Sequence, residues 1–142
     1  MNTLTTDELE NELSEISNIN DYIEKNSDEF VSIKLSDYLN ELLGTRDTAL
    51  SDVVKQCGLN RVYAYQLFEG QKNNPSRDKI IGIALGMKLD FAETQKLLKV
   101  AGMRPLYARD KRDSVITFAV KKEYNIIDTN ILLEEQGFKI IE

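Results

Sequence analysis

Two glycines, Gly58 and Gly70, each stand directly after a short segment with a helical spacing of apolar residues. Glycine reaches the left-handed backbone conformation that ends many helices, so each glycine predicts a helix end. Asn60 follows the first glycine by two positions and is a favourable N-cap, because its side chain can accept from a free amide of the next helix. This spacing leaves room only for a tight turn between two short helices.

The segment before Gly58 predicts the first of these helices, with Thr48 as its N-cap. The second helix is expected over residues 61–68, and Leu59 fills the corner between the two. The side chains expected to face inward are Val53, Val54, Cys57, Ala64 and Leu67.

This pattern resembles the helix-turn-helix of the Cro and phage-repressor type, also called the XRE family of transcriptional regulators. Its members have a glycine in the turn, a small cap two positions later, a small apolar residue within the second helix and a glycine at its end. A Pro-Ser pair commonly opens the next helix. The matching residues here are Gly58, Asn60, Ala64, Gly70 and Pro75-Ser76. The resemblance covers residues 35–98, about half of the chain, and implies a compact five-helix bundle that binds DNA.

Other helix signals complete an all-α prediction. A helix is expected over residues 35–43, and another starts after Ser76 and is ended by Gly86. Asp90 and Glu93 have the spacing of a capping box, which opens a helix that Gly102 ends. We therefore expect three regions: an acidic helical arm over 1–34, the helix-turn-helix domain over 35–104, and a C-terminal helical extension over 105–142.

The C-terminal extension is expected to hold two helices. Asp110 or Asp113 caps the first, which includes Val115–Val120; by composition that apolar run could instead be a buried strand. Asp128 caps the second helix, which ends at Gly137. The apolar segment either covers the bundle or pairs two protomers, and we predict a homodimer in which it supplies the interface. No internal repeat is expected at the periods of solenoid proteins.

The N-terminal arm is marked by its charge. Residues 1–34 hold nine acidic and two basic residues, a net charge of −7, whereas residues 35–104 hold ten basic and eight acidic residues. Thr5 and Glu8 have capping-box spacing, and Leu9, Leu13 and Ile16 give a narrow apolar stripe. The arm is expected to be a solvated amphipathic segment or, alternatively, a surface for a protein partner. The overall charge of −6 therefore does not exclude DNA binding, which depends on the field of one face.

Several classes of protein are disfavoured by composition. The chain has no histidine and a single cysteine, Cys57, so it lacks the usual general base and the usual zinc ligands. No phosphate-loop, dinucleotide-binding or nucleophile-elbow motif occurs, so we expect no enzyme, no cofactor and no metal. No apolar run reaches membrane-spanning length and no signal peptide opens the chain, so a cytoplasmic location without a membrane partner is expected.

The resemblance also implies which side chains meet DNA. The second helix of such motifs enters the major groove of double-stranded DNA, and its outward positions are those expected to contact bases. Arginine can pair with guanine and glutamine with adenine, valine can contact a thymine methyl, and tyrosine can reach phosphate or sugar. These positions are Arg61, Val62, Tyr63 and Gln66.

Backbone contacts are expected from residues that flank the motif. Phosphate contacts orient the protein on DNA without reading sequence. The expected residues are Arg46, Lys72, Asn73 and Asn74. Two features depart from the family: Leu50 stands where many members have glutamine, and Glu69 would repel phosphate if it faced DNA.

Two functions remain from the sequence. The first is a sequence-specific, repressor-like transcriptional regulator that binds operator DNA, as the resemblance implies. The second is a protein-interaction module, such as an antitoxin-like adaptor, whose acidic arm or C-terminal helices bind a protein partner. In the second, DNA binding is secondary or lost.

Overall fold

The computed structural model describes residues 34–72 and 74–142, together with Thr6. The chain divides into two compact units, Met1–Ser32 and Ile33–Glu142. Apart from Thr6 and Lys34, the acidic arm predicted over 1–34 lies outside the described residues, as does its proposed capping box.

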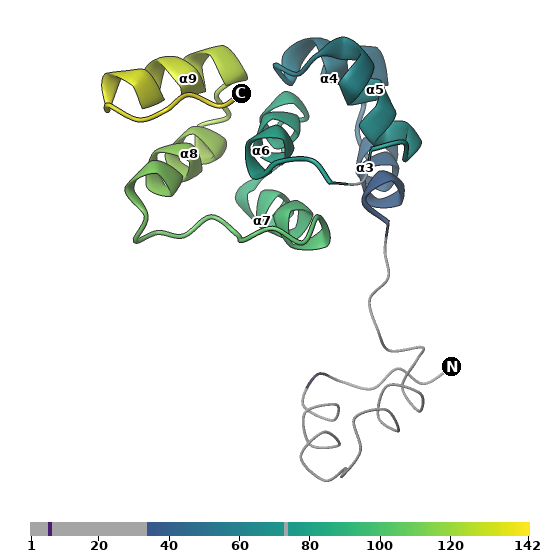
Figure 1. Cartoon of the computed structure of the whole chain (residues 1–142), viewed down its shortest axis with the longest axis horizontal. Coiled ribbons are helices and arrows are strands. Elements are labelled where there is room, and N and C mark those ends of the chain that lie inside the picture. Colours follow the sequence, from purple (N-terminus) through teal and green to yellow (C-terminus); the bar gives the residue numbers. More distant parts are fainter. Residues whose placement is uncertain (1–5, 7–33, 73) are drawn as a thin grey trace, which may run out of the picture. The chain divides into compact units, whose positions relative to one another are not determined.

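Every regular element in the described part of the second unit is an α-helix, so the all-α prediction is confirmed. Residues 115–120 are helical, which decides between the two alternatives for that run. None of the helices described is both long and apolar enough to cross a membrane. The helices are α3 (Leu35–Gly44), α4 (Leu50–Gln56), α5 (Arg61–Glu69), α6 (Arg77–Gly86), α7 (Phe91–Val100), α8 (Lys111–Lys121) and α9 (Ile126–Glu135) (Figure 1).

The turn between α4 and α5 forms as its caps predict. Gly58 and Gly70 are both left-handed, with φ of 75° and 81°. The Asn60 side chain accepts from the Tyr63 amide at 3.2 Å and so caps α5. The prediction for Thr48 is wrong, because α4 begins one residue later than expected and its N-cap is Ala49, which has no side-chain oxygen to offer.

The later helices are capped by short polar side chains. The capping box of Asp90 and Glu93 is confirmed, with hydrogen bonds of 2.7 and 3.0 Å. Asp110, one of the two alternatives, caps α8. The predicted cap of the last helix is wrong: Asn125 caps α9, and the Asp128 amide donates to it at 2.7 Å. Asp128 stands three residues inside, where its carboxylate still favours a helix start.

Two glycines of α6 allow it to approach α4 closely. A Cβ added at Gly82 would lie 2.7 Å from the Cys57 carbonyl oxygen, and one at Gly86 would lie 2.9 Å from the Cys57 Cα. The expectation that Gly86 ends its helix is confirmed, since α6 ends at this residue, which also allows the close approach to the end of α4. Lys88, with φ of 56°, takes the left-handed position that follows.

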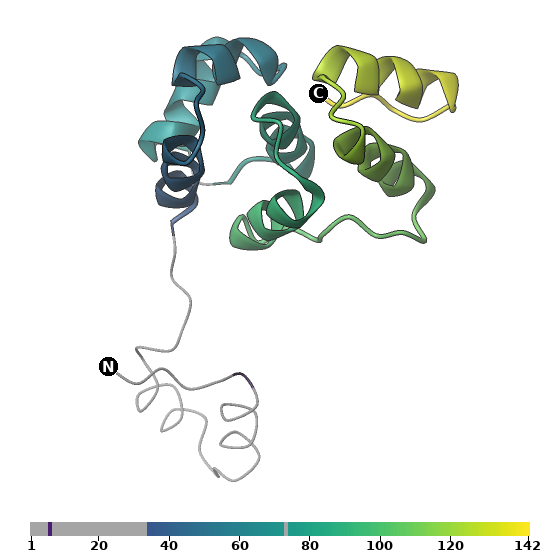
Figure 2. The same cartoon turned by 180° about the vertical axis from the view of Figure 1, so that it is seen from behind.

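One hydrophobic core extends from α3 to the residues after α9. It includes Leu39, Val53, Leu67, Ile80, Leu98, Ile116, Leu133 and Ile141, all of them buried. Figures 1 and 2 show α8 and α9 beside α6 and α7 from both sides. The helices of residues 35–104 and those of 105–142 therefore belong to one unit, and the C-terminal pair covers the bundle.

The pair α8–α9 repeats the pair α6–α7. Arg77 and Asp78 at the start of α6 recur 35 positions later as Arg112 and Asp113 in α8. The matching positions also include the left-handed Lys88 and Glu123, the caps Asp90 and Asn125, the buried Thr94 and Thr129, and the left-handed Gly102 and Gly137. The expectation of no internal repeat is therefore wrong. Only scattered residues are shared, and two copies give too few recurrences to stand out as a period.

Hydrogen bonds that close each pair recur at the same spacing. The Gln95 side chain brackets Leu106, accepting from its amide at 2.7 Å and donating to its carbonyl at 2.9 Å. Asn130 brackets Ile141 in the same way, at 2.8 and 3.2 Å. Leu106 and Ile141 are both buried, so each helix pair is completed by an apolar residue from the segment that follows it.

Two reciprocal ion pairs join the helix pair α6–α7 to the helix pair α8–α9. Arg77 donates to both carboxylate oxygens of Asp113 at 2.9 and 2.8 Å. Arg112 donates to both of Asp78 at 3.0 and 2.9 Å. The arginine of each helix pair thus contacts the aspartate of the other. Such reciprocal contacts are the pattern of a two-fold interface. The four helices α6–α9 thus form a pseudo-two-fold unit within one chain, and α4 and α5 are attached to one half of it.

Candidate nucleic-acid interface

The outward surface of α5 is set by the packing of its opposite side. Ala64, Leu67 and Phe68 are buried, which turns Val62, Gln66 and Glu69 outward at spacings of four and three residues. Val62 and Glu69 are exposed and Gln66 is half-buried. Two of the residues predicted to contact bases therefore share the outer ridge of this helix, together with one carboxylate.

Four of the predicted DNA-contacting residues are brought together beside this ridge. Val62, Tyr63, Gln66 and Lys72 line one hollow of about 560 Å³. The rest of its wall comes from the turn, from α6 and from the end of the chain, namely Gly58, Leu59, Asn60, Lys79, Ile141 and Glu142. The loop after α5 and the first turn of α6 thus place two ammonium groups next to α5.

Lys79 is the contributor that sequence reasoning missed. It is the third residue of α6, and its amide donates to the Ser76 cap at 3.4 Å. Its ammonium lies 5.2 Å from the centre of the Tyr63 ring, over the ring face, where a cation–π attraction holds it. Burial raises the pKa of the Tyr63 hydroxyl. The Pro-Ser signal that predicts the start of α6 could have pointed to Lys79.

Arg61 lies on another side of α5. It is exposed, and its guanidinium carbon is 5.9 Å from the centre of the Tyr65 ring. Tyr65 is half-buried against the core and supports this position. Arg61 is therefore available to solvent, at the first residue of the helix, but does not line the hollow with the other three predicted base contacts.

Arg46 is directed toward α7. Its guanidinium forms an ion pair with Glu93, and both side chains are half-buried. The Arg46 Nε is buried without a hydrogen-bond partner. A phosphate would therefore meet Arg46 with the Glu93 carboxylate already beside it. The phosphate contact remains a prediction.

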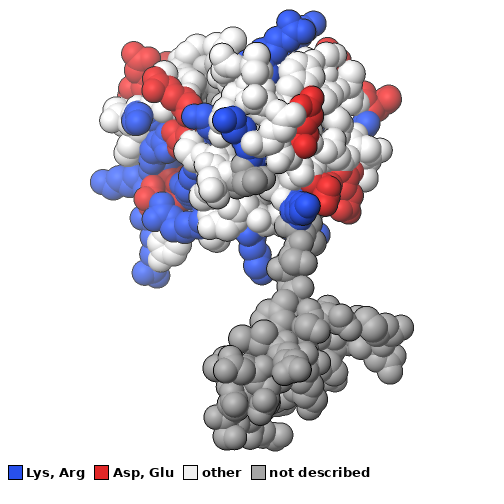
Figure 3. Space-filling view, turned by 45° about the vertical axis from the view of Figure 1, so that its right-hand side comes forward, with Lys and Arg blue, Asp and Glu red and all other residues white. Residues whose placement is uncertain are grey.

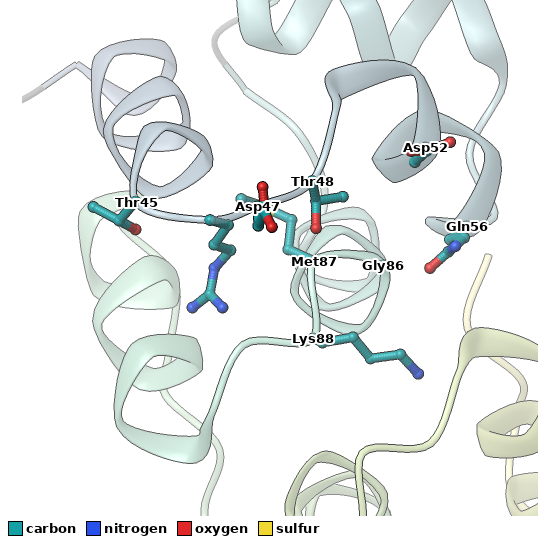
Figure 4. A pocket seen from close by; sticks show the side chains of 9 residues that line it. Thr45, Asp47, Thr48, Asp52, Gln56, Gly86, Met87 and Lys88 are labelled. Carbon is teal, nitrogen blue, oxygen red and sulfur yellow. The ribbon is translucent and has the colours of Figure 1, made fainter.

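A second hollow adjoins Arg46, between the α3–α4 loop and the end of α6 (Figure 4). Its volume is about 460 Å³. Arg46 and Lys88 line it together with Asp47 and Asp52, so positive and negative side chains balance. Lys88 also donates to the Glu123 carbonyl at 2.9 Å. This balance favours no single class of charged ligand.

The remaining predicted contacts and departures have mixed placements. Asn74 is exposed in the loop before α6, whereas Asn73 lies outside the described residues. Leu50 packs against the core at the start of α4, which accounts for an apolar residue at that position. In the part of the chain that is described, no three Cys, Asp or Glu side chains converge as a metal site requires.

Charge is unevenly distributed over the second unit. Figure 3 shows Lys and Arg side chains gathered over the centre and lower left of the drawn face, while Asp and Glu side chains lie at its upper left and at its right. Of the 24 acidic residues in the chain, nine precede residue 34, so the second unit lacks the strong negative charge of the whole. Its surface therefore provides local positive fields, and these are what phosphate would meet.

Comparisons with known proteins give no further assignment. No family model matches the chain, and neither a curated protein nor a solved structure matches it.

Proposed function

We propose that this chain is a sequence-specific, repressor-like DNA-binding regulator of the helix-turn-helix type, with α5 in the major groove. The observation that carries the proposal is the hollow beside α5, in which Tyr63 and Gln66 stand next to Lys72 and Lys79. A reading side chain and flanking ammonium groups on one surface are what groove recognition requires. The helices α3 to α7 then correspond to the five-helix domain of the XRE family.

In this arrangement the side chains divide by role. Gln66 and Val62 point outward from α5 and meet base edges, with Arg61 at the start of the helix. Lys72 and Lys79 lie to one side and meet phosphate, and so orient the helix without reading sequence. Glu69, exposed at the far end of α5, must stay away from the phosphate backbone. This requirement favours a docking in which the N-terminal half of α5 enters the groove.

The regulator acts as a homodimer in this proposal, because one short helix reads only a few base pairs. Two copies would read two half-sites about one helical turn apart. Occupation of such a site would block other proteins from it. Cytoplasmic location and the absence of a cofactor belong to the same proposal.

Selection from a random pool of duplex DNA tests the proposal. A regulator of this type enriches one motif with two related halves, and its affinity falls as salt rises because bound cations are released from DNA. Enrichment of no motif by a folded protein would refute sequence-specific reading. Binding with no salt dependence would exclude the phosphate contacts assigned to Lys72 and Lys79.

One observation favours the second function, an adaptor-like protein-interaction module. Phe118, Ile127 and Ile131 of α8 and α9 are large apolar side chains exposed to solvent. A module of this kind would bind its partner there and show weak, motif-free binding to DNA. Purification with a second protein at equal stoichiometry, without motif enrichment, would support this function over the first.

A further inference from the structure

The internal repeat relates the outer face of α9 to the side of α7 that faces α3. In the first helix pair, α7 lies beside α3, and Ala92, Glu93 and Lys96 line the α7 side of a hollow between the two helices. The Lys96 ammonium lies 5.3 Å from the centre of the Tyr38 ring, and Glu93 pairs with Arg46, just after α3. This side of α7 therefore faces another helix of the chain, although Ala92 and Lys96 themselves stay exposed.

The equivalent positions of α9, 35 residues later, are Ile127, Asp128 and Ile131. No helix of the described unit occupies them: Ile127 is 66% exposed and Ile131 is 52% exposed. Two large apolar side chains thus stand exposed on α9 at the positions where α7 has an alanine and a lysine.

The same comparison extends to α8. Phe118 stands at the position of Ile83, and Tyr124 at that of Leu89; Ile83 and Leu89 are buried, whereas Phe118 is 46% exposed. The rings of Phe118 and Tyr124 meet edge to face, with centres 5.9 Å apart. We call Phe118, Tyr124, Ile127 and Ile131 the α8–α9 face. Three of the five exposed large hydrophobic residues in the described part of the chain belong to it, so exposed apolar side chains are concentrated on these two helices.

The charges around this face indicate what covers it. Glu134 follows Ile127 and Ile131 at helical spacing, in the last turn of α9, where a carboxylate is unfavourable beside the helix's own C-terminal dipole. Lys122 lies at the other end, just before α9, with its ammonium 5.8 Å from the centre of the Phe118 ring. An identical α9 running antiparallel would bring each carboxylate to the positive end of its partner.

We propose that two copies of this chain associate through the α8–α9 face, with their α9 helices antiparallel about a two-fold axis. Ile127 then packs on Ile131 of the partner subunit, and Glu134 faces Lys122 of the partner subunit. The order of apolar and charged residues along this surface is self-complementary when two copies run antiparallel, as a closed two-fold contact requires. This contact is the one through which the proposed regulator would dimerise. Only its role on DNA rests on the proposed function.

The test is the dimer dissociation constant of the full chain, measured by sedimentation equilibrium without DNA. The wild type is expected to dimerise. Combined Ile127→Ser and Ile131→Ser substitutions should raise the dissociation constant about ten- to hundredfold, because apolar area is lost from both sides. Tyr107→Ser, which alters an exposed aromatic residue outside the face, is the matched control and should leave the constant within about twofold.

Charge reversal tests the antiparallel arrangement. Lys122→Glu or Glu134→Lys alone should weaken the dimer about three- to tenfold at low salt, since each places like charges together. The double reversal restores opposite charges and should return the constant to within about twofold of wild type. If the double reversal weakens the dimer by as much as the two single substitutions added together, the antiparallel arrangement is overturned. A wild type that stays monomeric, or a serine variant that dimerises as wild type does, would overturn the proposed face.

The outcome is separable from that of the proposed function. A dimer that depends on this face but enriches no DNA motif would support the face and refute the regulator. Motif binding by a protein that is monomeric both free and on DNA would support the reading of DNA by α5, and would refute both the face and the homodimer.

Discussion

Replacing Asp113 with alanine should destabilise the second unit far more than the equivalent change at Asp78. The Asp113 side chain is 2% exposed and accepts from Arg77 twice and from the Tyr107 amide at 3.0 Å. Removing it leaves the Arg77 guanidinium, itself only 19% exposed, without its carboxylate, and the Tyr107 amide without its acceptor. Breaking a buried pair costs about 3–5 kcal/mol. Because Arg77 keeps bonds to the Arg104 and Pro105 carbonyls, we expect about 3 kcal/mol.

Asp78→Ala is the matched control, since the pseudo-two-fold relation gives Asp78 the same kind of partner. The side chains of Asp78 and Arg112 are 21% and 22% exposed, so water compensates much of the loss. We expect about 1 kcal/mol. Equilibrium unfolding in urea, followed by far-ultraviolet circular dichroism, gives both free energies. Equal losses for the two variants, or a loss below about 1 kcal/mol for Asp113→Ala, would refute the view that the buried pair joins the two halves.

Three further outcomes are expected. Gly82→Ala should cost about 1–3 kcal/mol in thermal or urea unfolding, because its Cβ would meet the Cys57 carbonyl oxygen, whereas Gly44→Ala, with open space around it, should cost nothing or stabilise; equal effects would contradict the close packing of α6 on α4. Burial raises the pKa of Asp113, but the hydrogen bonds from Arg77 and the Tyr107 amide, together with the charges of Arg77 and Arg104, outweigh burial and lower this pKa below its ordinary value. The stability that Asp113 contributes is then present above the unfolded-state pKa of about 4 and is lost as pH falls through the lower folded-state pKa. The unfolding free energy should therefore fall less steeply at acid pH in Asp113→Asn than in the wild type. An unchanged slope would contradict this. Removing residues 1–26 should leave a folded protein that binds non-specific DNA more tightly, most clearly at low salt in a fluorescence titration, because nine carboxylates repel phosphate; failure to fold would show that the arm is structural.

Local signals in the sequence were sufficient for the helix-turn-helix segment. Asn60, Gly58 and Gly70 act on their own backbone or on the next turn, so their effects can be read from neighbours in the chain. The same holds for the capping box of Asp90. The errors at Thr48 and Asp128 are errors of one to three residues in the position of a helix start. The N-cap of α4 is Ala49, which no cap signal marks, and that of α9 is Asn125, one of two polar side chains that could serve as the cap.

Long-range features could not be predicted in the same way. The pairing of Arg77 with Asp113 depends on how two helix pairs dock, and charged residues of this kind are common on any helical surface. The position of Ile141 and Glu142 beside α5 also depends on docking, since Asn130 brackets Ile141 and so directs the end of the chain. The repeat itself was present in the sequence, but its shared residues became recognisable only through equivalent hydrogen bonds.

The candidate interface shows the same division. Val62, Tyr63 and Gln66 follow from the resemblance and from helical spacing, and the structure places them with Lys72 in one hollow. Lys79 comes from another helix and was missed, and Arg46 is engaged by Glu93, a partner 47 positions away that no local pattern indicates. Their roles on DNA remain predictions.

The most direct test of the account is to select bound sequences from a random duplex pool with the wild type and with Gln66→Ala. We predict one enriched motif for the wild type, and for Gln66→Ala the same motif with preference lost at one position of each half-site and affinity reduced by about 1–3 kcal/mol. Lys79→Ala, the matched control from the same hollow, should keep the motif, weaken all duplexes alike and reduce the salt slope by about one unit. An identical motif and affinity for Gln66→Ala and wild type would contradict the central claim that α5 reads DNA.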